Sequence, residues 1–181
     1  MSVTYQKADE KVLMLLEQVR DQWHPNLRDA NVQIGVLMAL NPDGDAVTHG
    51  GYAALAKVKP VSLKDRVSKG YDAELVIDES KWLALPHEQR VSLLDHELSH
   101  LDTIPVPPEE LAKLRAENAD APGWKLDDLG RPRLRSIPGN WNAGDGFRDV
   151  VARHGHHAVE YLNLSNARAA ADAARQAGAE V

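Results

Sequence analysis

A His-Glu-x-x-His motif lies near the middle of this 181-residue chain, in the segment DHELSH at residues 95–100. Residues four apart on a helix project from one face, so His96 and His100 could bind one metal ion through neutral imidazole nitrogens. Glu97 would lie about 100° further around the helix and could take a proton from a nearby water. Zinc fits this chemistry because it lowers the pKa of bound water toward about 7 and polarises a carbonyl. The motif therefore predicts zinc-assisted hydrolysis, with His96 and His100 as metal ligands and Glu97 as the catalytic base and acid.

A helix over residues 86–101 is predicted to carry this motif. Pro86 suits a first helical turn, and prolines 105, 107 and 108 end the helical pattern. On a helical wheel the histidines lie nearly opposite an apolar stripe, and a polar arc that includes Ser92 and Asp95 lies between them. The stripe consists of Val91, Leu94, Leu98 and Leu101. We therefore expect the helix to bury its apolar side and to present the two histidines at a cleft.

The remaining elements suggest how this helix is held. The hydrophobic spacing predicts a helix over 6–23 that ends before Pro25, and strands near 32–39, 52–58 and 73–77. Further along we expect a polar connection over 60–71, a short helix over 109–118, two short strands around a turn within 124–137, and a last helix over 146–154. These elements indicate an α+β, zincin-like fold in which a small mixed sheet and the N-terminal helix support the active helix. Residues 1–164 are expected to form one domain and residues 165–181 an Ala-rich tail.

Composition limits the classes of protein that remain. The chain has no cysteine, which excludes disulfides, thiolate catalysis and Cys-ligated metal sites. Its net charge of -6 argues against a dedicated nucleic-acid binder. No apolar run approaches the roughly 20 residues that cross a bilayer, and the first residues do not resemble a secretory signal. We therefore expect a cytoplasmic protein, without a membrane partner, that acts on a peptide or protein substrate.

Several motifs in order resemble one known family. They are KVKP at 57–60, GYD at 70–72, VID at 76–78, Trp82, EQR at 88–90, LDHELSHL at 94–101, DLGRP at 128–132 and the residues from Phe147 to Gly155. Over roughly residues 10–157 the chain resembles the phage metallopeptidase family, which is in turn similar to SprT-like zincins. The resemblance implies a zinc-dependent peptidase encoded by a phage or prophage, acting in the cytoplasm of the host cell.

The third metal ligand does not follow from this resemblance. The family has a His-Asp pair before its last helix, whereas residues 138–147 of this chain contain no histidine, and Ser99 replaces a common cysteine. Asp145, just before the last helix, is the first candidate, although an aspartate there also suits a helix cap. His154 is the second candidate, because it shares a helical face with Phe147 and Val150. Glu117 and the pair at 156 and 157 are weaker alternatives, and a site with only two histidines stays open.

Two other functions compete with the peptidase. The chain could be a non-catalytic accessory protein in which a metal or a hydrogen-bonded histidine pair stabilises the fold while the surface binds a phage or host partner. Alternatively, Arg131, Arg133 and Arg135 alternate along a predicted strand and could bind nucleic acid, as in SprT-like peptidases, although a solvated strand face explains them better.

Overall fold

A four-stranded mixed sheet forms one layer of the protein. The structure, a computed structural model, describes residues 2–49, 51–138, 145–161 and 175. The strands are β1 (Thr4–Lys7), β2 (Ile34–Leu40), β5 (Ala56–Pro60) and β6 (Ala73–Asp78), in the order β1-β2-β6-β5. The β2 and β6 strands pair in parallel, and the other two pairs are antiparallel. The fold is therefore mixed α+β with a small mixed sheet, as the sequence predicted.

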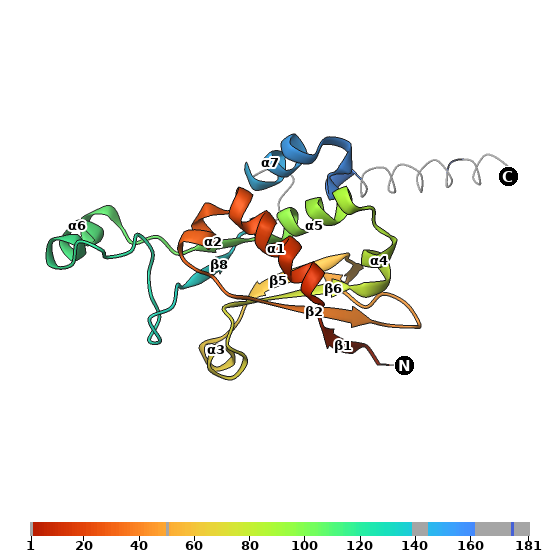
Figure 1. Cartoon of the computed structure of the whole chain (residues 1–181), viewed down its shortest axis with the longest axis horizontal. Coiled ribbons are helices and arrows are strands. Elements are labelled where there is room, and N and C mark those ends of the chain that lie inside the picture. Colours follow the sequence, from red (N-terminus) through yellow and green to blue (C-terminus); the bar gives the residue numbers. More distant parts are fainter. Residues whose placement is uncertain (1, 50, 139–144, 162–174, 176–181) are drawn as a thin grey trace.

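Helices cover one face of this sheet. Figure 1 shows α1 (Glu10–Trp23) and α5 (His87–Ser99) lying against it, with α7 (Asp145–His154) beyond α5. The α5 helix contacts α1, α7 and β5, so it is the central element of the molecule. Three shorter helices lie in the connections between these elements: α2 (Pro25–Asp29), α3 (Leu63–Lys69) and α4 (Glu79–Ala84). A 3-10 turn, η1 (Gly155–His157), follows α7 directly.

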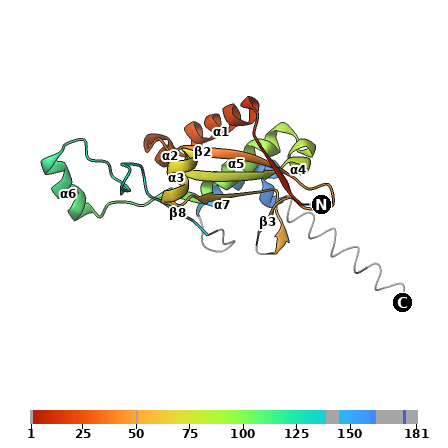
Figure 2. The same cartoon turned by 90° about the horizontal axis from the view of Figure 1, so that it is seen from below.

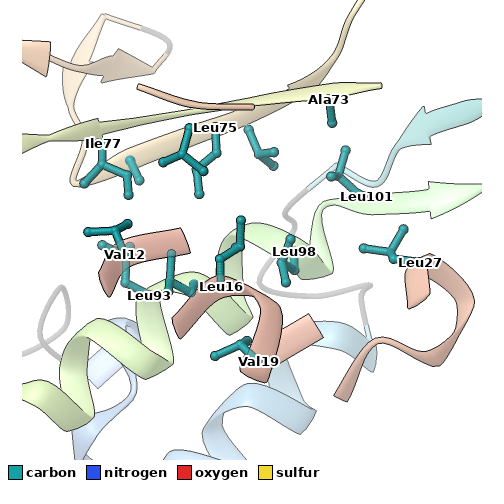
Figure 3. Packing of buried hydrophobic residues seen from close by; sticks show 14 of the residues in the cluster. Val12, Leu16, Val19, Leu27, Ala73, Leu75, Ile77, Leu93, Leu98 and Leu101 are labelled. Carbon is teal, nitrogen blue, oxygen red and sulfur yellow. The ribbon is translucent and has the colours of Figure 1, made fainter. Parts of the chain in front are cut away.

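The hydrophobic core lies between the sheet and the two central helices (Figure 3). Its α1 members, Val12, Leu16 and Val19, follow helical spacing and are all buried. Asp9 caps this helix, because its carboxylate accepts a hydrogen bond from the Val12 N–H. The sheet contributes Ala73, Leu75 and Ile77, the helix α5 contributes Leu93 and Leu98, and Figure 3 shows Leu27 of α2 and Leu101 beside them. The helix α5 is therefore held in place by its packing against α1 as well as against the sheet.

Two small hairpins and a projecting segment complete the described chain. The β3 strand (Thr48–His49) pairs with β4 (Tyr52–Ala53), and β7 (Leu101–Thr103) pairs with β8 (Leu134–Ser136). Between β7 and β8 the chain extends outward to α6 (Pro108–Glu117), which lies far from the sheet in both views (Figures 1 and 2). No residue of α6 is buried. Within the described ranges, no helix is both long and apolar enough to span a bilayer.

The structure also corrects parts of the sequence prediction. Residues 6 and 7, predicted as the start of the first helix, belong to strand β1 because they pair with β2, and the helix begins at Glu10. The connection over 60–71 contains α3, which Ser62 caps and which Gly70 ends with a positive φ of 78°. Helix α4 was not predicted. Within 124–137 the two sides of the predicted turn do meet, at an antiparallel bridge between Leu126 and Pro132, and the strand β8 pairs in addition with β7. The proposed tail over 165–181 lies outside the described residues, apart from residue 175.

Candidate metal-binding active site

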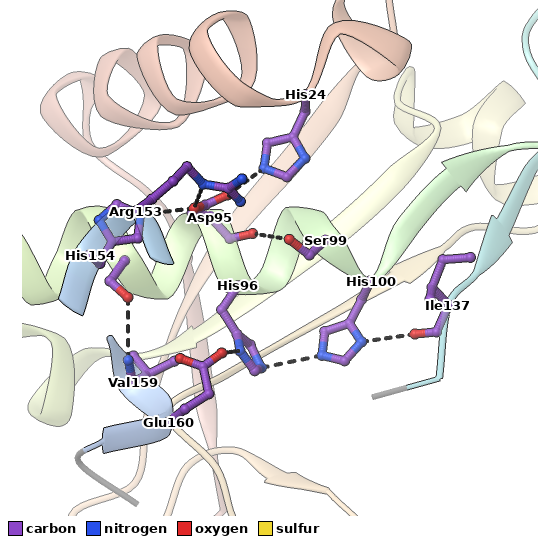
Figure 4. Close-up of polar contacts among 11 residues, drawn as sticks. His24, Asp95, His96, Ser99, His100, Ile137, Arg153, His154, Val159 and Glu160 are labelled. Carbon is purple, nitrogen blue, oxygen red and sulfur yellow. Dashed lines mark hydrogen bonds and ion pairs between the residues drawn. The ribbon is translucent and has the colours of Figure 1, made fainter. Parts of the chain in front are cut away.

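Helix α5 brings the two histidines of the motif together. His96 lies in its last turn, and His100 follows as the C-terminal cap, still in a helical conformation. Their rings therefore project from the same side, with the two Nε2 atoms 3.3 Å apart (Figure 4). The chain then turns at once into β7, because Leu101 pairs with Ser136.

Each imidazole is oriented by a partner at its other nitrogen. His100 Nδ1 lies 2.9 Å from the carbonyl oxygen of Ile137, and His96 Nδ1 lies 2.8 Å from Oε1 of Glu160. A carbonyl and a carboxylate accept hydrogen bonds, so each Nδ1 carries the hydrogen and donates. The lone pairs of both rings are then on the facing Nε2 atoms. Burial also lowers the pKa of His100, which favours the neutral imidazole that binds metals.

This donor pair fits a divalent metal ion. Two zinc–nitrogen bonds of about 2.05 Å at a tetrahedral angle place their nitrogen atoms about 3.3 Å apart. The observed separation of the Nε2 atoms is 3.3 Å. However, the described part of the chain contains no group of three or more His, Asp or Glu side chains that could hold a metal. The geometry thus provides two ligands that suit a metal ion.

Glu97 lies beside the histidine pair in an environment that opposes its charge. Its side chain is only 5% exposed, and Oε2 accepts a hydrogen bond of 2.9 Å from the backbone N–H of Val58 in β5. Burial raises the pKa of Glu97, although the charges of His96 and Lys57 and the hydrogen bond from Val58 oppose this effect. A carboxylate with a raised pKa can accept a proton more readily near neutral pH, as a general base must.

A cavity of about 1140 Å³ lies in front of these three residues. Strand β5 and the segment before it form one wall, and Arg148, Val151 and Ala152 of α7 form part of another. His96, Glu97 and His100 line the same space. The volume is slightly larger than the roughly 300–1,000 Å³ of ordinary ligand pockets, so a short stretch of peptide can enter it.

The other side of α5 holds a buried network around Asp95. This carboxylate is 0% exposed and is bonded by His24, Arg153 and His154, each at 2.8–2.9 Å. Burial alone would raise the pKa of Asp95, but these hydrogen bonds outweigh it and hold the pKa at about 2. Figure 4 shows this network on the side of the helix away from the His96–His100 pair. His154, the second candidate for the third metal ligand, is thus paired with Asp95.

The other predicted site residues are distributed as follows. Asp145 begins α7, and its side chain lies outside the described residues. Glu117 is exposed on α6, far from α5 (Figure 1), and the histidines at 156 and 157 pack against each other. Arg131 pairs with Asp72 and Arg135 with Asp102, so two of the three alternating arginines are engaged in ion pairs.

Sequence reasoning missed several residues of the site. Glu160 orients His96 but lies 64 positions away, beyond the segment in which the motifs were recognised. His49, in strand β3, also lines the cavity and was not singled out from the sequence. The backbone N–H of Val58 leaves no trace in a sequence pattern. A search for an acidic residue after the last helix, to complement the motif histidines, could have found Glu160.

A helix that presents His96, Glu97 and His100 to a cavity beside a sheet edge defines a candidate metal-dependent hydrolytic site. The family described as "Putative phage metallopeptidase" matches the chain over residues 4–166. The chain therefore belongs to this family. Membership supports a peptidase activity and implies a metal cofactor. Comparison with curated proteins and with solved structures gives no match in either set.

Proposed function

We propose that this protein is a phage- or prophage-encoded, zinc-dependent peptidase of the His-Glu-x-x-His type with a zincin-like fold. The observation that carries the proposal is the pair of Nε2 atoms 3.3 Å apart, each with its ring oriented by an acceptor at Nδ1. His96 and His100 would hold the ion through these atoms. Zinc would polarise the scissile carbonyl and lower the pKa of the attacking water toward about 7. The absence of cysteine fits a protein that acts in the cytoplasm of the host cell.

Glu97 performs the proton transfers in this proposal. Its carboxylate takes a proton from the attacking water and delivers that proton to the amine nitrogen that leaves. The hydrogen bond from the Val58 N–H to Oε2 keeps the side chain in place and leaves Oε1 for the proton. Because burial raises the pKa of Glu97, its protonated form stays accessible, and the same carboxyl group can act first as base and then as acid.

Asp145 is the favoured third ligand. Arg148 lines the cavity, and position 145 is on the same face of α7, since residues three apart on a helix are neighbours. His154 is less suitable because its Nε2 is bonded to Asp95 on the other side of α5. Asp145→Ala should therefore weaken zinc binding more than His154→Ala does, measured by competition with a chelator.

The substitution Glu97→Gln tests the proposed reaction. It should abolish cleavage of a broad peptide library while the zinc content of the purified protein stays at the wild-type level. Glu88→Gln is the matched control, because Glu88 is an exposed glutamate in the first turn of the same helix. A wild-type protein that binds zinc but cleaves no peptide would favour the non-catalytic accessory protein instead.

A further inference from the structure

Cationic side chains surround the candidate active site, although the chain as a whole is acidic. The cavity is lined by Lys57, Lys59, Lys81 and Arg148, against the two carboxylates Glu97 and Glu160. The net charge of the chain is -6. The charged side chains that line the cavity are therefore mostly positive, whereas the net charge of the molecule is negative. This difference indicates that these cations have a role at the cavity.

Two of the four cations are available to a ligand. Lys59 lies 3.6 Å from Glu74, and Lys81 lies 2.7 Å from Asp45, so both are engaged in ion pairs. Within the described ranges, neither Lys57 nor Arg148 has a carboxylate at ion-pair distance, and both are exposed. Lys57 and Arg148 are thus the charges that an incoming ligand would meet.

Lys57 and Arg148 lie on different walls of the cavity. Lys57 is in the edge strand β5, between the buried residues Ala56 and Val58, and Arg148 is in α7. Both side chains line the same cavity as His96, Glu97 and His100. A peptide in the cavity would pass between one cation on the strand and another on the helix.

We propose that the site prefers peptides with Asp or Glu next to the scissile bond, and that Lys57 and Arg148 determine this preference. This inference rests on the proposed peptidase function and specifies its substrate class. Long-range repulsion by the acidic chain does not prevent it, because salt screens charges beyond about 8 Å under physiological conditions. A nucleic acid fits less well, since a continuous polyanion would also meet the negative charge of the rest of the molecule.

Binding of labelled decapeptides tests the preference independently of cleavage. Three peptides would alternate Ala with Glu, Gln or Lys, and every protein would carry Glu97→Gln so that no peptide is consumed. The Glu peptide should bind at least tenfold more tightly than the Lys peptide. Lys57→Glu and Arg148→Glu should each weaken its binding by about threefold or more and together reverse the preference. Lys57→Gln and Arg148→Gln provide milder variants if a charge reversal prevents folding.

A matched double variant separates a local effect from a change in net charge. Lys11→Glu with Lys113→Glu changes the total charge by the same amount at exposed positions that do not line the cavity. This variant should keep the preference for the Glu peptide. Equal binding of all three peptides, or equal loss in both double variants, would overturn the inference. Tighter binding of a single-stranded oligonucleotide, lost in the Lys57 and Arg148 variants, would assign the cations to phosphate.

Cleavage by the wild-type chain distinguishes the two proposals. Selective binding of the Glu peptide without any cleavage would contradict the peptidase and leave an acidic-peptide binding site. Cleavage without a preference for Asp or Glu near the cleaved bond would support the peptidase and overturn the inference about its substrates.

Discussion

Glu97 combines a buried position with a proposed role that requires it to ionise. The pKa of this carboxyl is raised by burial, while His96, Val58 and Lys57 favour the charged form. Each opposing contact comes from a residue at the cavity, so the carboxylate is partly stabilised where the proposed reaction needs it. A cost to folding stability that serves catalysis is a common property of active sites.

The pKa of Glu97 leads to a prediction about stability and pH in the absence of metal. A raised folded pKa means that the contribution of Glu97 to stability is fully present below its ordinary value of 4.5 and is lost as the pH rises through the folded pKa. Glu97→Gln should therefore melt at a higher temperature than wild type at pH 7 in EDTA, and the two melting temperatures should converge near pH 4. Calorimetry across this pH range measures the difference. A wild-type chain that is the more stable at pH 7 would contradict the prediction.

Glu160 is a positioning residue for His96 in the proposed site. Its Oε1 accepts from His96 Nδ1, and its Oε2 is buried with no hydrogen-bond partner among the described residues. Outer hydrogen bonds of this kind typically change metal affinity by about 10–100-fold. Glu160→Ala should weaken zinc binding by that factor, and Glu160→Gln should recover part of it, because its amide oxygen still accepts. Chelator competition measures both.

The control for this prediction is Glu117→Ala, which removes an exposed glutamate from α6. It should leave zinc affinity unchanged. If Glu160→Gln binds zinc as poorly as Glu160→Ala, the hydrogen bond from His96 to Glu160 does not determine the affinity for zinc, and the prediction is wrong.

At the scale of elements, the sequence predicted the strongly patterned helices and strands. Helices α1, α5 and α7 and strands β2 and β6 were anticipated because their apolar residues recur with helical or strand spacing. The short elements α3, α4 and β1 were missed, since each is too short for a periodic signal. The wheel of α5 placed Asp95 in a polar arc, whereas the structure buries it completely. A helical wheel cannot show that His24, at the end of α1, and Arg153 and His154, in α7, bond to this carboxylate.

The buried Asp95 network should hold three elements together. His24 lies between α1 and α2, and Arg153 and His154 are the last residues of α7. The carboxylate of Asp95 therefore links α5 to the end of α1 and to the end of α7. Asp95→Asn leaves Arg153 without a buried counter-charge and weakens the contacts with His24 and His154, so it should lower the free energy of unfolding by about 3 kcal/mol or more. Denaturant unfolding measures this loss. Asp120→Asn, at an exposed turn, is the control and should change little.

The same carboxylate gives a pH signature of the opposite sign to that of Glu97. Its folded pKa is lowered from 3.8 to about 2, so its contribution to stability is present above pH 3.8 and is lost as the pH falls through about 2. The difference between wild type and Asp95→Asn should therefore shrink across that interval. A difference that does not depend on pH would mean that Asp95 acts through packing and not through its charge.

At the scale of the whole molecule, contacts between distant segments determine what the sequence could not predict. The motif identified His96, Glu97 and His100 because their spacing lies within one helix. Glu160, Ile137 and the Val58 N–H come from three other parts of the chain, and only the packing of α5 against β5 and the segment after α7 brings them to the motif. The projecting position of α6 was equally hidden, since an amphipathic pattern does not reveal whether a helix has a partner to pack against.

Because these parts meet at the site only in the folded protein, the proposed zinc should stabilise the whole fold. A ligand present at 100 times its Kd, and bound only by the native state, adds about 2.7 kcal/mol, which is roughly 5–10 °C in Tm for a chain of this size. Thermal scans with and without EDTA should show this rise in wild type and in His87→Ala, which removes an exposed histidine from the same helix. His96→Ala and His100→Ala should lose it. A rise that persists in both variants would place the zinc elsewhere, because the facing Nε2 atoms are then not its ligands.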